Sequence, residues 1–263
     1  MKRRELPVRH LFGVPIHALR MDQAIEIVDE TITSGRQLLI GVVNAAKMVN
    51  MRHDALLRDS VLHADLILAD GMGVVWASRL LRRCLPERVP GIDLMLHMLH
   101  LSERRGYGVF CLGATADVLE KSIAEMRRRY PKLNVAGYHH GYFTEQDEQG
   151  IAEQIKASGA DILLVAMTSP KKERFLARWS QEIDVPICHG VGGSFDVLAG
   201  KVKRAPESWQ KLGLEWLYRV LQEPRRMWRR YLVTNALFCM MTMRELFRRG
   251  GAGPESSTRD CPT

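Results

Sequence analysis

Six short apolar runs recur between Leu38 and Val191, and most are separated by segments with helical periodicity. The runs expected to form strands are Leu38–Val43, Asp65–Ala69, Tyr107–Leu112, Leu133–Tyr138, Asp161–Met167 and Val185–Val191. The segments expected to be helical include Ala45–Leu57, Val74–Arg83, Ile92–Arg104, Val118–Tyr130 and Glu145–Ala157. Strands that are apolar on both faces suit a parallel sheet covered by helices on two sides. The alternation therefore predicts an α/β fold with a Rossmann-like, open, mainly parallel sheet flanked by helices.

Polar and glycine-rich segments follow these strands, at the edge where an open parallel sheet binds its ligands. The candidate residues at this edge are Asn44, Asp70, Gly113, Gly192, Gly193 and Asp196. Glycines let backbone N–H groups approach a phosphate, and helix N-termini favour anions. The glycines match neither the dinucleotide fingerprint G-x-G-x-x-G nor the P-loop G-x-x-x-x-G-K-[ST]. The sequence thus indicates a nucleotide-phosphate site without favouring a nicotinamide-dependent oxidoreductase.

Asp70 is the first candidate for acid–base chemistry. It ends a strand and is followed by Gly71, which leaves room for a substrate beside the carboxylate. A carboxylate in this place can accept the proton of an attacking hydroxyl group. The spacing supports equally well a second interpretation, in which Asp70 caps the helix that begins near Gly73. Asp196 also has two interpretations: a hydrogen bond to a ribose or base, or a turn cap.

Two cations lie near the same edge. Arg88 lies in a proline-flanked loop, where it is either a surface residue or a mobile clamp on a leaving diphosphate. Lys172 lies at an expected helix start, where it either meets phosphate or belongs to the exposed face of the helix. No metal site is predicted, because the five cysteines never show Cys-x-x-Cys spacing and the pair His139 and His140 has no further ligands nearby.

The net charge of +8 is concentrated in residues 201–249. That segment carries 12 Lys or Arg against four Glu, whereas residues 1–200 carry 25 basic and 24 acidic side chains. In a helix that begins after Pro224, the four arginines between 225 and 230 fall on one side, and Trp228 and Tyr231 fall on the other. This pattern is typical of a helix in a membrane interface. The alternatives are an amphipathic helix packed on the body and a nucleic-acid-binding tail, which the many aliphatic residues disfavour.

The chain is therefore expected to have three parts. Residues 1–200 form the α/β body, residues 201–249 a basic amphipathic helical appendage, and residues 250–263, rich in Gly, Pro, Ser and Thr, a disordered tail. The longest apolar stretch, Leu232–Met243, is too short to span a bilayer, and no secretory signal is evident. We expect a cytoplasmic protein that lies peripherally on the inner face of the cell membrane.

Three longer motifs are specific enough to compare with known families. They are Ala64–Trp76, Gly137–Phe143 and Gly190–Pro206, the last continuing into Gly213–Arg219. Together they closely resemble the WecG/TagA/CpsF family of bacterial glycosyltransferases, and the resemblance runs from about Phe12 to Arg249, nearly the whole chain.

The resemblance implies a metal-independent, inverting transfer of a sugar from a UDP-sugar to an undecaprenyl-diphosphate-linked saccharide, without a cofactor. The best-known members transfer N-acetylmannosamine, or its uronic acid, to lipid-linked N-acetylglucosamine. The family also implies a homo-oligomer that can dissociate, so that the appendage folds over the active site on the membrane. Val42, Lys172 and Pro90 depart from the usual Thr, Gln and Thr, so that a different UDP-hexose, such as UDP-glucose, fits equally well.

Individual roles follow by matching motifs. Asp70 matches the proposed general base, Asn44 the polar residue beside it, and Arg88 a mobile arginine thought to steady the leaving diphosphate. Asp196 and the glycines before it fall in the nucleotide pocket. The appendage arginines thought to hold the acceptor's diphosphate correspond to Arg219, Arg226 and Arg229. The alternative class is a non-enzymatic α/β binding module whose basic tail attaches to RNA or to a protein partner.

Overall fold

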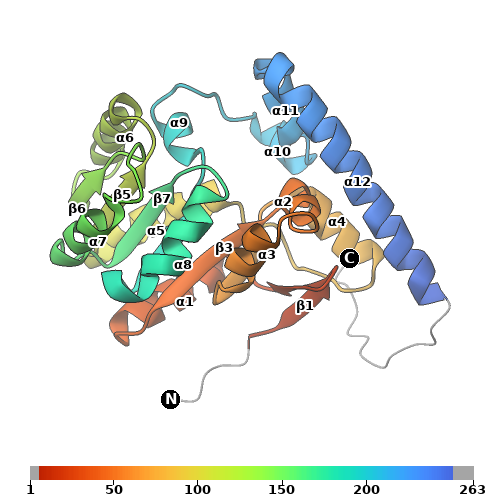
Figure 1. Cartoon of the computed structure of the whole chain (residues 1–263), viewed down its shortest axis with the longest axis horizontal. Helices are drawn as coiled ribbons and strands as arrows, with labels where there is room; N and C mark the ends of the chain where they lie inside the picture. Colours follow the sequence, from red (N-terminus) through yellow and green to blue (C-terminus); the bar gives the residue numbers. More distant parts are fainter. Residues whose placement is uncertain (1–5, 251–263) are drawn as a thin grey trace.

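The computed structural model describes residues 6–250, and its centre is a six-stranded parallel sheet with helices on both faces (Figure 1). The strands are β3 (Leu38–Val43), β4 (Leu66–Ala69), β5 (Gly108–Gly113), β6 (Asn134–His139), β7 (Ile162–Ala166) and β8 (Ile187–Gly190). Their order is β4-β3-β8-β7-β5-β6, and every neighbouring pair is parallel. The six expected strands and the Rossmann-like α/β class are confirmed. The tail expected at residues 250–263 lies, from residue 251 onward, outside the described residues.

Twelve helices are seen within residues 6–250. They are α1 (Met21–Thr33), α2 (Ala45–Asn50), α3 (Ala55–Leu62), α4 (Met72–Leu80), α5 (Gly91–Arg105), α6 (Ala116–Arg129), α7 (Glu148–Ala157), α8 (Lys171–Ile183), α9 (Ser194–Leu198), α10 (Glu207–Lys211), α11 (Glu215–Gln222) and α12 (Pro224–Gly250). The single helix expected over Ala45–Leu57 is wrong. The Asp54 side chain accepts a hydrogen bond from the Leu57 N–H and starts α3 as a separate helix.

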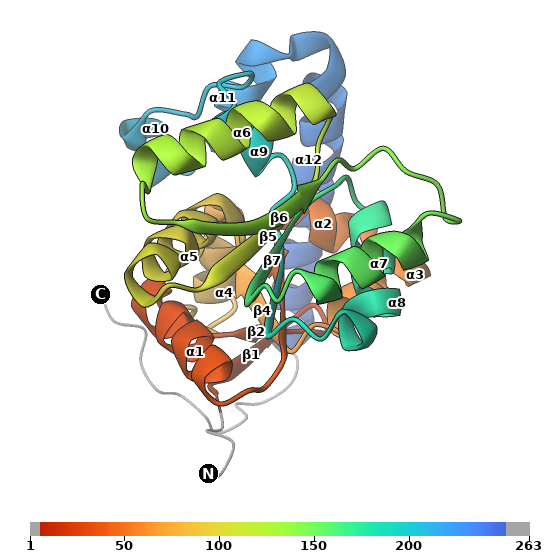
Figure 2. The ribbon, with the colours of Figure 1, turned by 90° about the vertical axis from the view of Figure 1, so that its left-hand side faces the viewer.

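Alternate strand residues enter different hydrophobic cores, which explains why the strands read as unbroken apolar runs. Leu66 and Leu68 of β4 belong to a core that also includes residues of α1, α5, α6 and α9, whereas Ile67 and Ala69 belong to a core that includes residues of α2, α3 and α4. Figure 2 shows α1 and α5 on one side of the sheet and α7 and α8 on the other. Because successive side chains of a strand point to opposite faces, a doubly covered sheet needs apolar residues at every position.

A short antiparallel hairpin, β1 (Val8–Leu11) and β2 (Val14–His17), was not predicted. Prolines and charges interrupt its apolar pattern, and its turn depends on positive φ angles at Phe12 (53°) and Gly13 (83°). The hairpin is attached to the sheet by His17, whose Nδ1 accepts a hydrogen bond from the Ile67 N–H at 3.0 Å.

The C-terminal helix α12 runs along one edge of the molecule beside α2 and α11 (Figure 1). Phe238 and Met241 are buried in the core that α2 and α4 share, and the Phe238 ring meets Phe12 edge-on at 5.6 Å. The expected C-terminal helix is confirmed, and its middle closes one side of the body's core. Within the described residues, no helix is both long enough and apolar enough to cross a bilayer.

Candidate active site

The Asp70 carboxylate lies at the carboxyl edge of the sheet and is held by two donors. Its Oδ1 accepts a hydrogen bond from the Gly91 N–H at 2.9 Å, and its Oδ2 accepts one from Asn44 Nδ2 at 3.2 Å. The helix-cap interpretation is wrong, because Gly71 is the N-cap of α4 and no side chain caps that helix. The carboxylate is half-buried and oriented by the first residue of α5 and the amide after β3.

Asn44 joins this carboxylate to helix α2. Its Oδ1 accepts a hydrogen bond from the Lys47 N–H at 3.0 Å, which caps α2, and this leaves Nδ2 to donate to Asp70. The two residues are 26 positions apart in the chain, but Val43 and Ala69, which precede them, are register partners on neighbouring parallel strands. The pairing expected from the motifs is therefore built by the register of β3 and β4.

Arg88 lies beside the same strand end, because the Val89 N–H donates to the Ala69 carbonyl at 2.7 Å. The surface-residue interpretation is wrong, since the Arg88 side chain is only 16% exposed. Its Nη1 lies 2.5 Å from Glu215 Oε2, and its Nη2 lies 3.3 Å from Gln210 Oε1. The guanidinium group is thus paired with a carboxylate of α11 and an amide of α10.

A second arginine completes this connection to the appendage. Arg204 Nη2 lies 2.6 Å from Asp93, in the first turn of α5, and 3.0 Å from Gln210 Oε1. Gln210 therefore accepts from both arginines and joins the start of α5 to α10. Sequence reasoning assigned no role to Asp93, Arg204, Gln210 or Glu215. Arg204 and Glu215 lie within the motifs compared with the family, and that comparison was the available signal for them.

Lys172 is buried in α8 next to a shared carboxylate, so the exposed-face interpretation is wrong. Its Nζ lies 3.5 Å from Glu173 Oε1, and Lys47 Nζ lies 3.1 Å from the same oxygen. Burial lowers the pKa of Lys172 to about 8, and repulsion from Lys47 adds to the effect. The stem of Lys172 crosses Gly190, where a Cβ would lie 2.6 Å from Lys172 Cδ. The buried Glu173 carboxylate thus forms ion pairs with both Lys47 and Lys172.

Backbone conformation explains why glycine stands at two of the expected positions at the carboxyl edge of the sheet. Gly113 has a φ of 129°, and a Cβ there would lie 2.4 Å from the Ala166 carbonyl oxygen, so the close approach of β5 to β7 requires glycine. Gly192 has a φ of 55° in the turn that leads into α9. These positions are explained by backbone conformation, and their proposed contacts with a substrate stay predictions.

A hollow between α9 and α11 brings several expected binding residues together. It is lined by Gly193, Asp196, Val197, Val202, Arg219, Gln222 and Glu223. Asp196 lies 3.4 Å from Lys201 Nζ. Arg219 faces this hollow from the appendage, whereas Arg229 lies exposed on α12. The side chain of Arg226 lies outside the described residues.

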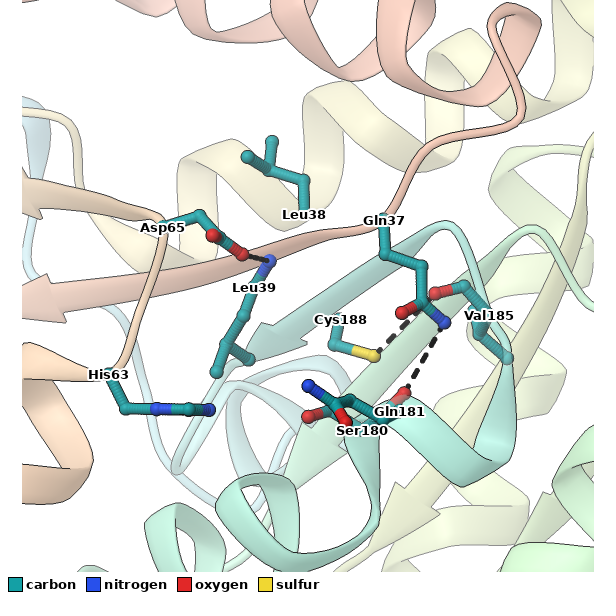
Figure 3. A pocket seen from close by; sticks show the side chains of 9 residues that line it. All are labelled: Gln37, Leu38, Leu39, His63, Asp65, Ser180, Gln181, Val185 and Cys188. Carbon is teal, nitrogen blue, oxygen red and sulfur yellow. Dashed lines mark hydrogen bonds between the residues drawn. The ribbon is translucent and has the colours of Figure 1, made fainter.

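Another hollow lies at the opposite, amino edge of the sheet (Figure 3). Its lining comprises Gln37, Leu38, Leu39, His63, Asp65, Ser180, Gln181, Val185 and Cys188. Asp65 is exposed there, as its place before β4 indicates, and its Oδ2 accepts from the Leu39 N–H at 2.9 Å. None of the candidate residues from the sequence lines this hollow, so it is separate from the rim around Asp70.

The glycosyl transferase family WecG/TagA/CpsF matches residues 9–252 of the chain. The chain belongs to this family. A relative from Bacillus spizizenii, an N-acetylglucosaminyldiphosphoundecaprenol N-acetyl-beta-D-mannosaminyltransferase, is 39% identical over 185 residues. The match covers 70% of this chain and 69% of that protein. The resemblance inferred from the three motifs is confirmed, and with it the glycosyltransferase class.

In this WecG/TagA/CpsF chain, the expected residues form two groups along the carboxyl edge of the sheet. Asp70, Asn44 and Arg88 cluster where β4 and β3 end, with Lys172 on the adjoining face. The second group lies in the hollow between α9 and α11 and comprises Gly193, Asp196 and Arg219. Gly113 ends β5 further along the same edge. The roles that the family suggests for these residues stay predictions.

Proposed function

We propose that this protein is an inverting, metal-independent glycosyltransferase that moves a hexose from a UDP-sugar to an undecaprenyl-diphosphate-linked saccharide in bacterial cell-surface polysaccharide synthesis. The observation that carries the proposal is the Asp70 carboxylate, oriented at the rim by the Gly91 N–H and the Asn44 amide. Asp70 removes the proton of the acceptor hydroxyl, which attacks the anomeric carbon from the face opposite UDP. This single displacement inverts the anomeric centre. The lipid-linked acceptor named for the Bacillus spizizenii relative supports this acceptor class.

The leaving diphosphate needs a cation, and Arg88 lies close to Asp70 along the backbone, because the next residue, Val89, bonds to the carbonyl of Ala69. A guanidinium group can bind two phosphate oxygens at once, which a lysine cannot reproduce. Preorganised charge of this kind contributes about 3 kcal/mol to stabilisation of the transition state. Arg88 is paired with Glu215 in this structure, so the diphosphate competes with that carboxylate for the arginine. The nucleotide extends toward the hollow at α9, where Asp196 meets the ribose or the base.

The donor sugar is N-acetylmannosamine, as in the relative's name, or another hexose such as glucose. Val42 and Lys172 are the residues that we expect to select the donor sugar, because both line the crevice between β3 and α8. A thermal-shift screen against UDP-sugars, followed by transfer to a lipid-diphosphate acceptor, tests the proposal. We expect at least one UDP-hexose to raise Tm and then to be transferred with inversion. If no UDP-sugar binds, or if the product retains the anomeric configuration, the proposed function is wrong.

Chelation is expected to leave the transfer rate unchanged. In this mechanism an arginine side chain balances the diphosphate charge, and chelators do not remove it. Transfer rates measured with about 5 mM EDTA and with added Mg²⁺ should agree within about twofold, because no metal acts as the Lewis acid. A loss of activity with EDTA that Mg²⁺ restores would contradict the metal-independent mechanism.

The appendage carries exposed apolar side chains next to exposed arginines. The exposed large apolar residues described in α11 and α12 include Trp216, Leu221, Trp228, Leu232, Val233, Met240, Met243 and Phe247. Arg225, Arg229 and Arg244 are exposed on the same long helix. Apolar side chains that enter the headgroup region, flanked by arginines that pair with lipid phosphates, suit the surface of an anionic membrane. We place the protein peripherally on the inner face of the cell membrane, with Arg219, Arg226 and Arg229 holding the acceptor's diphosphate.

Reversing two of these charges is expected to weaken membrane binding. The double variant Arg225→Glu, Arg229→Glu should bind anionic phosphatidylglycerol vesicles at least about 10-fold more weakly, since each basic residue contributes about 1 kcal/mol at the surface. Vesicle co-sedimentation at low salt measures the effect. Substitution is preferable to truncation, because Phe238 and Met241 of the same helix are buried in the core.

The matched control is Arg127→Glu, Lys156→Glu, which makes the same charge change on α6 and α7, at the far end of the molecule from α12 (Figure 1). The control should bind vesicles as the unaltered protein does. Equal losses in both variants would show a general charge effect. Tight binding to single-stranded RNA, with no vesicle binding, would favour the alternative of an RNA-binding module.

A further inference from the structure

His189 of β8 is a fully buried histidine whose two ring nitrogens both face backbone carbonyls. Its Nε2 lies 3.2 Å from the Gly91 carbonyl oxygen, and its Nδ1 lies 3.3 Å from that of Ile40. The side chain has no exposed surface. Ile187, two positions earlier on the same strand, lies in the core that α1 and α5 form with the sheet, so His189 points to that same face. A histidine in this place interrupts an otherwise apolar layer, so its polar contacts need an explanation.

The ring is neutral, because burial lowers the pKa of His189 to about 4. The charge of Lys172 on α8 disfavours a proton on the ring, while Asp70 after β4 acts in the opposite direction. A neutral imidazole carries one N–H, so it can donate to only one of the two carbonyls. The tautomer therefore decides which backbone segment the histidine anchors.

Gly91 is the residue through which His189 reaches the catalytic rim. The Gly91 N–H donates to Asp70 Oδ1 at 2.9 Å, and the Gly91 carbonyl faces His189 Nε2. Gly91 is also the first residue of α5, directly after the loop that carries Arg88. A glycine has no side chain to pack and is conformationally free, so its position depends on its backbone partners.

We propose that His189 donates a hydrogen bond from Nε2 to the Gly91 carbonyl and is thereby a positioning residue for Asp70. The bond ties the start of α5 to β8, which keeps the Gly91 N–H aimed at the carboxylate. The inference rests on the proposed function of Asp70 as the base. His189 does not touch the substrate; it acts on the reaction only through Gly91.

Three substitutions separate this role from simple core packing. Glutamine places an amide nitrogen where His189 has Nε2, asparagine places one where it has Nδ1, and methionine fills the space without a donor. We expect His189→Met to lower kcat about 10-fold with little change in the KM for the UDP-sugar, because a displaced base slows the chemical step without removing donor contacts. His189→Gln should recover most of that loss, and His189→Asn should not.

Equal kcat values for the glutamine and asparagine variants, or an unchanged kcat in all three, would overturn the proposal. The comparison of the two amides stands even if the methionine variant fails to fold. The ¹⁵N spectrum of the imidazole in the unaltered protein gives an independent readout: the Nε2–H tautomer is expected, and the Nδ1–H tautomer would overturn the proposal. An active Asp70→Asn variant would instead overturn the proposed base, whatever the histidine variants do.

Discussion

Replacing Asp70 with asparagine is expected to lower kcat about 1,000-fold, the loss typical of removing a general base. Asparagine has nearly the same shape, and its amide oxygen can still accept the hydrogen bond that the Gly91 N–H donates to Asp70. The variant loses the proton acceptor and the hydrogen bond from Asn44 Nδ2, but none of the groups proposed to hold UDP. It should therefore bind UDP with an affinity within about twofold of the unaltered protein. Single-turnover transfer to a lipid-diphosphate acceptor, with UDP binding by calorimetry, measures both effects.

Asp65→Asn is the matched control, because Asp65 lies just before the same strand at the opposite edge of the sheet. Its side chain accepts a hydrogen bond from the Leu39 N–H, which asparagine can also satisfy. Transfer by this variant should be unchanged. An Asp70→Asn variant that retains a substantial fraction of activity would show that another group takes the proton, and the mechanism proposed here would be wrong.

Replacing Arg88 with alanine is expected to lower kcat/KM about 100-fold, the lower end of the loss seen when one preorganised donor to developing charge is removed. The guanidinium group is the cation assigned to the leaving diphosphate, and the partly buried position of Arg88 strengthens its interaction with charge. Arg88→Lys should recover only part of the loss, because a lysine cannot form the paired hydrogen bonds of a guanidinium group. Steady-state kinetics with varied UDP-sugar separate the effects on kcat and KM.

Glu215→Gln gives the control for the ion pair. It removes the charge that holds Arg88 in this structure but keeps a hydrogen-bond acceptor at 2.5 Å from Nη1. If the diphosphate displaces Glu215, this variant should lower the KM for the UDP-sugar by about threefold, because one competing charge–charge interaction is weakened. If Arg88→Ala and Glu215→Gln instead lose the same activity, the pair has a purely structural role.

Local signals in the sequence were sufficient for the sheet and for part of the site. Strands β4, β5, β7 and β8 are buried along their whole length, so their apolar runs are visible without knowledge of their neighbours, and all six expected runs formed strands. Asp70 and Asn44 were identifiable because each directly follows such a run. The same reasoning merged α2 with α3, since hydrophobic periodicity does not show where the Asp54 cap starts a new helix.

Contacts between distant segments gave no such signal. The pair Arg88 and Glu215 is separated by 127 positions, and His189 and Ile40 by 149. Strand order places these groups together, and a residue's own neighbours in the chain do not reveal which strand will lie beside it. By itself, the sequence determined the strands, the polar residues at their ends and the basic C-terminal helix, because burial and charge leave a local pattern. Only the tertiary structure decided that Gly91 holds Asp70 and that Glu215 neutralises Arg88, because those partners meet through the packing of separate elements.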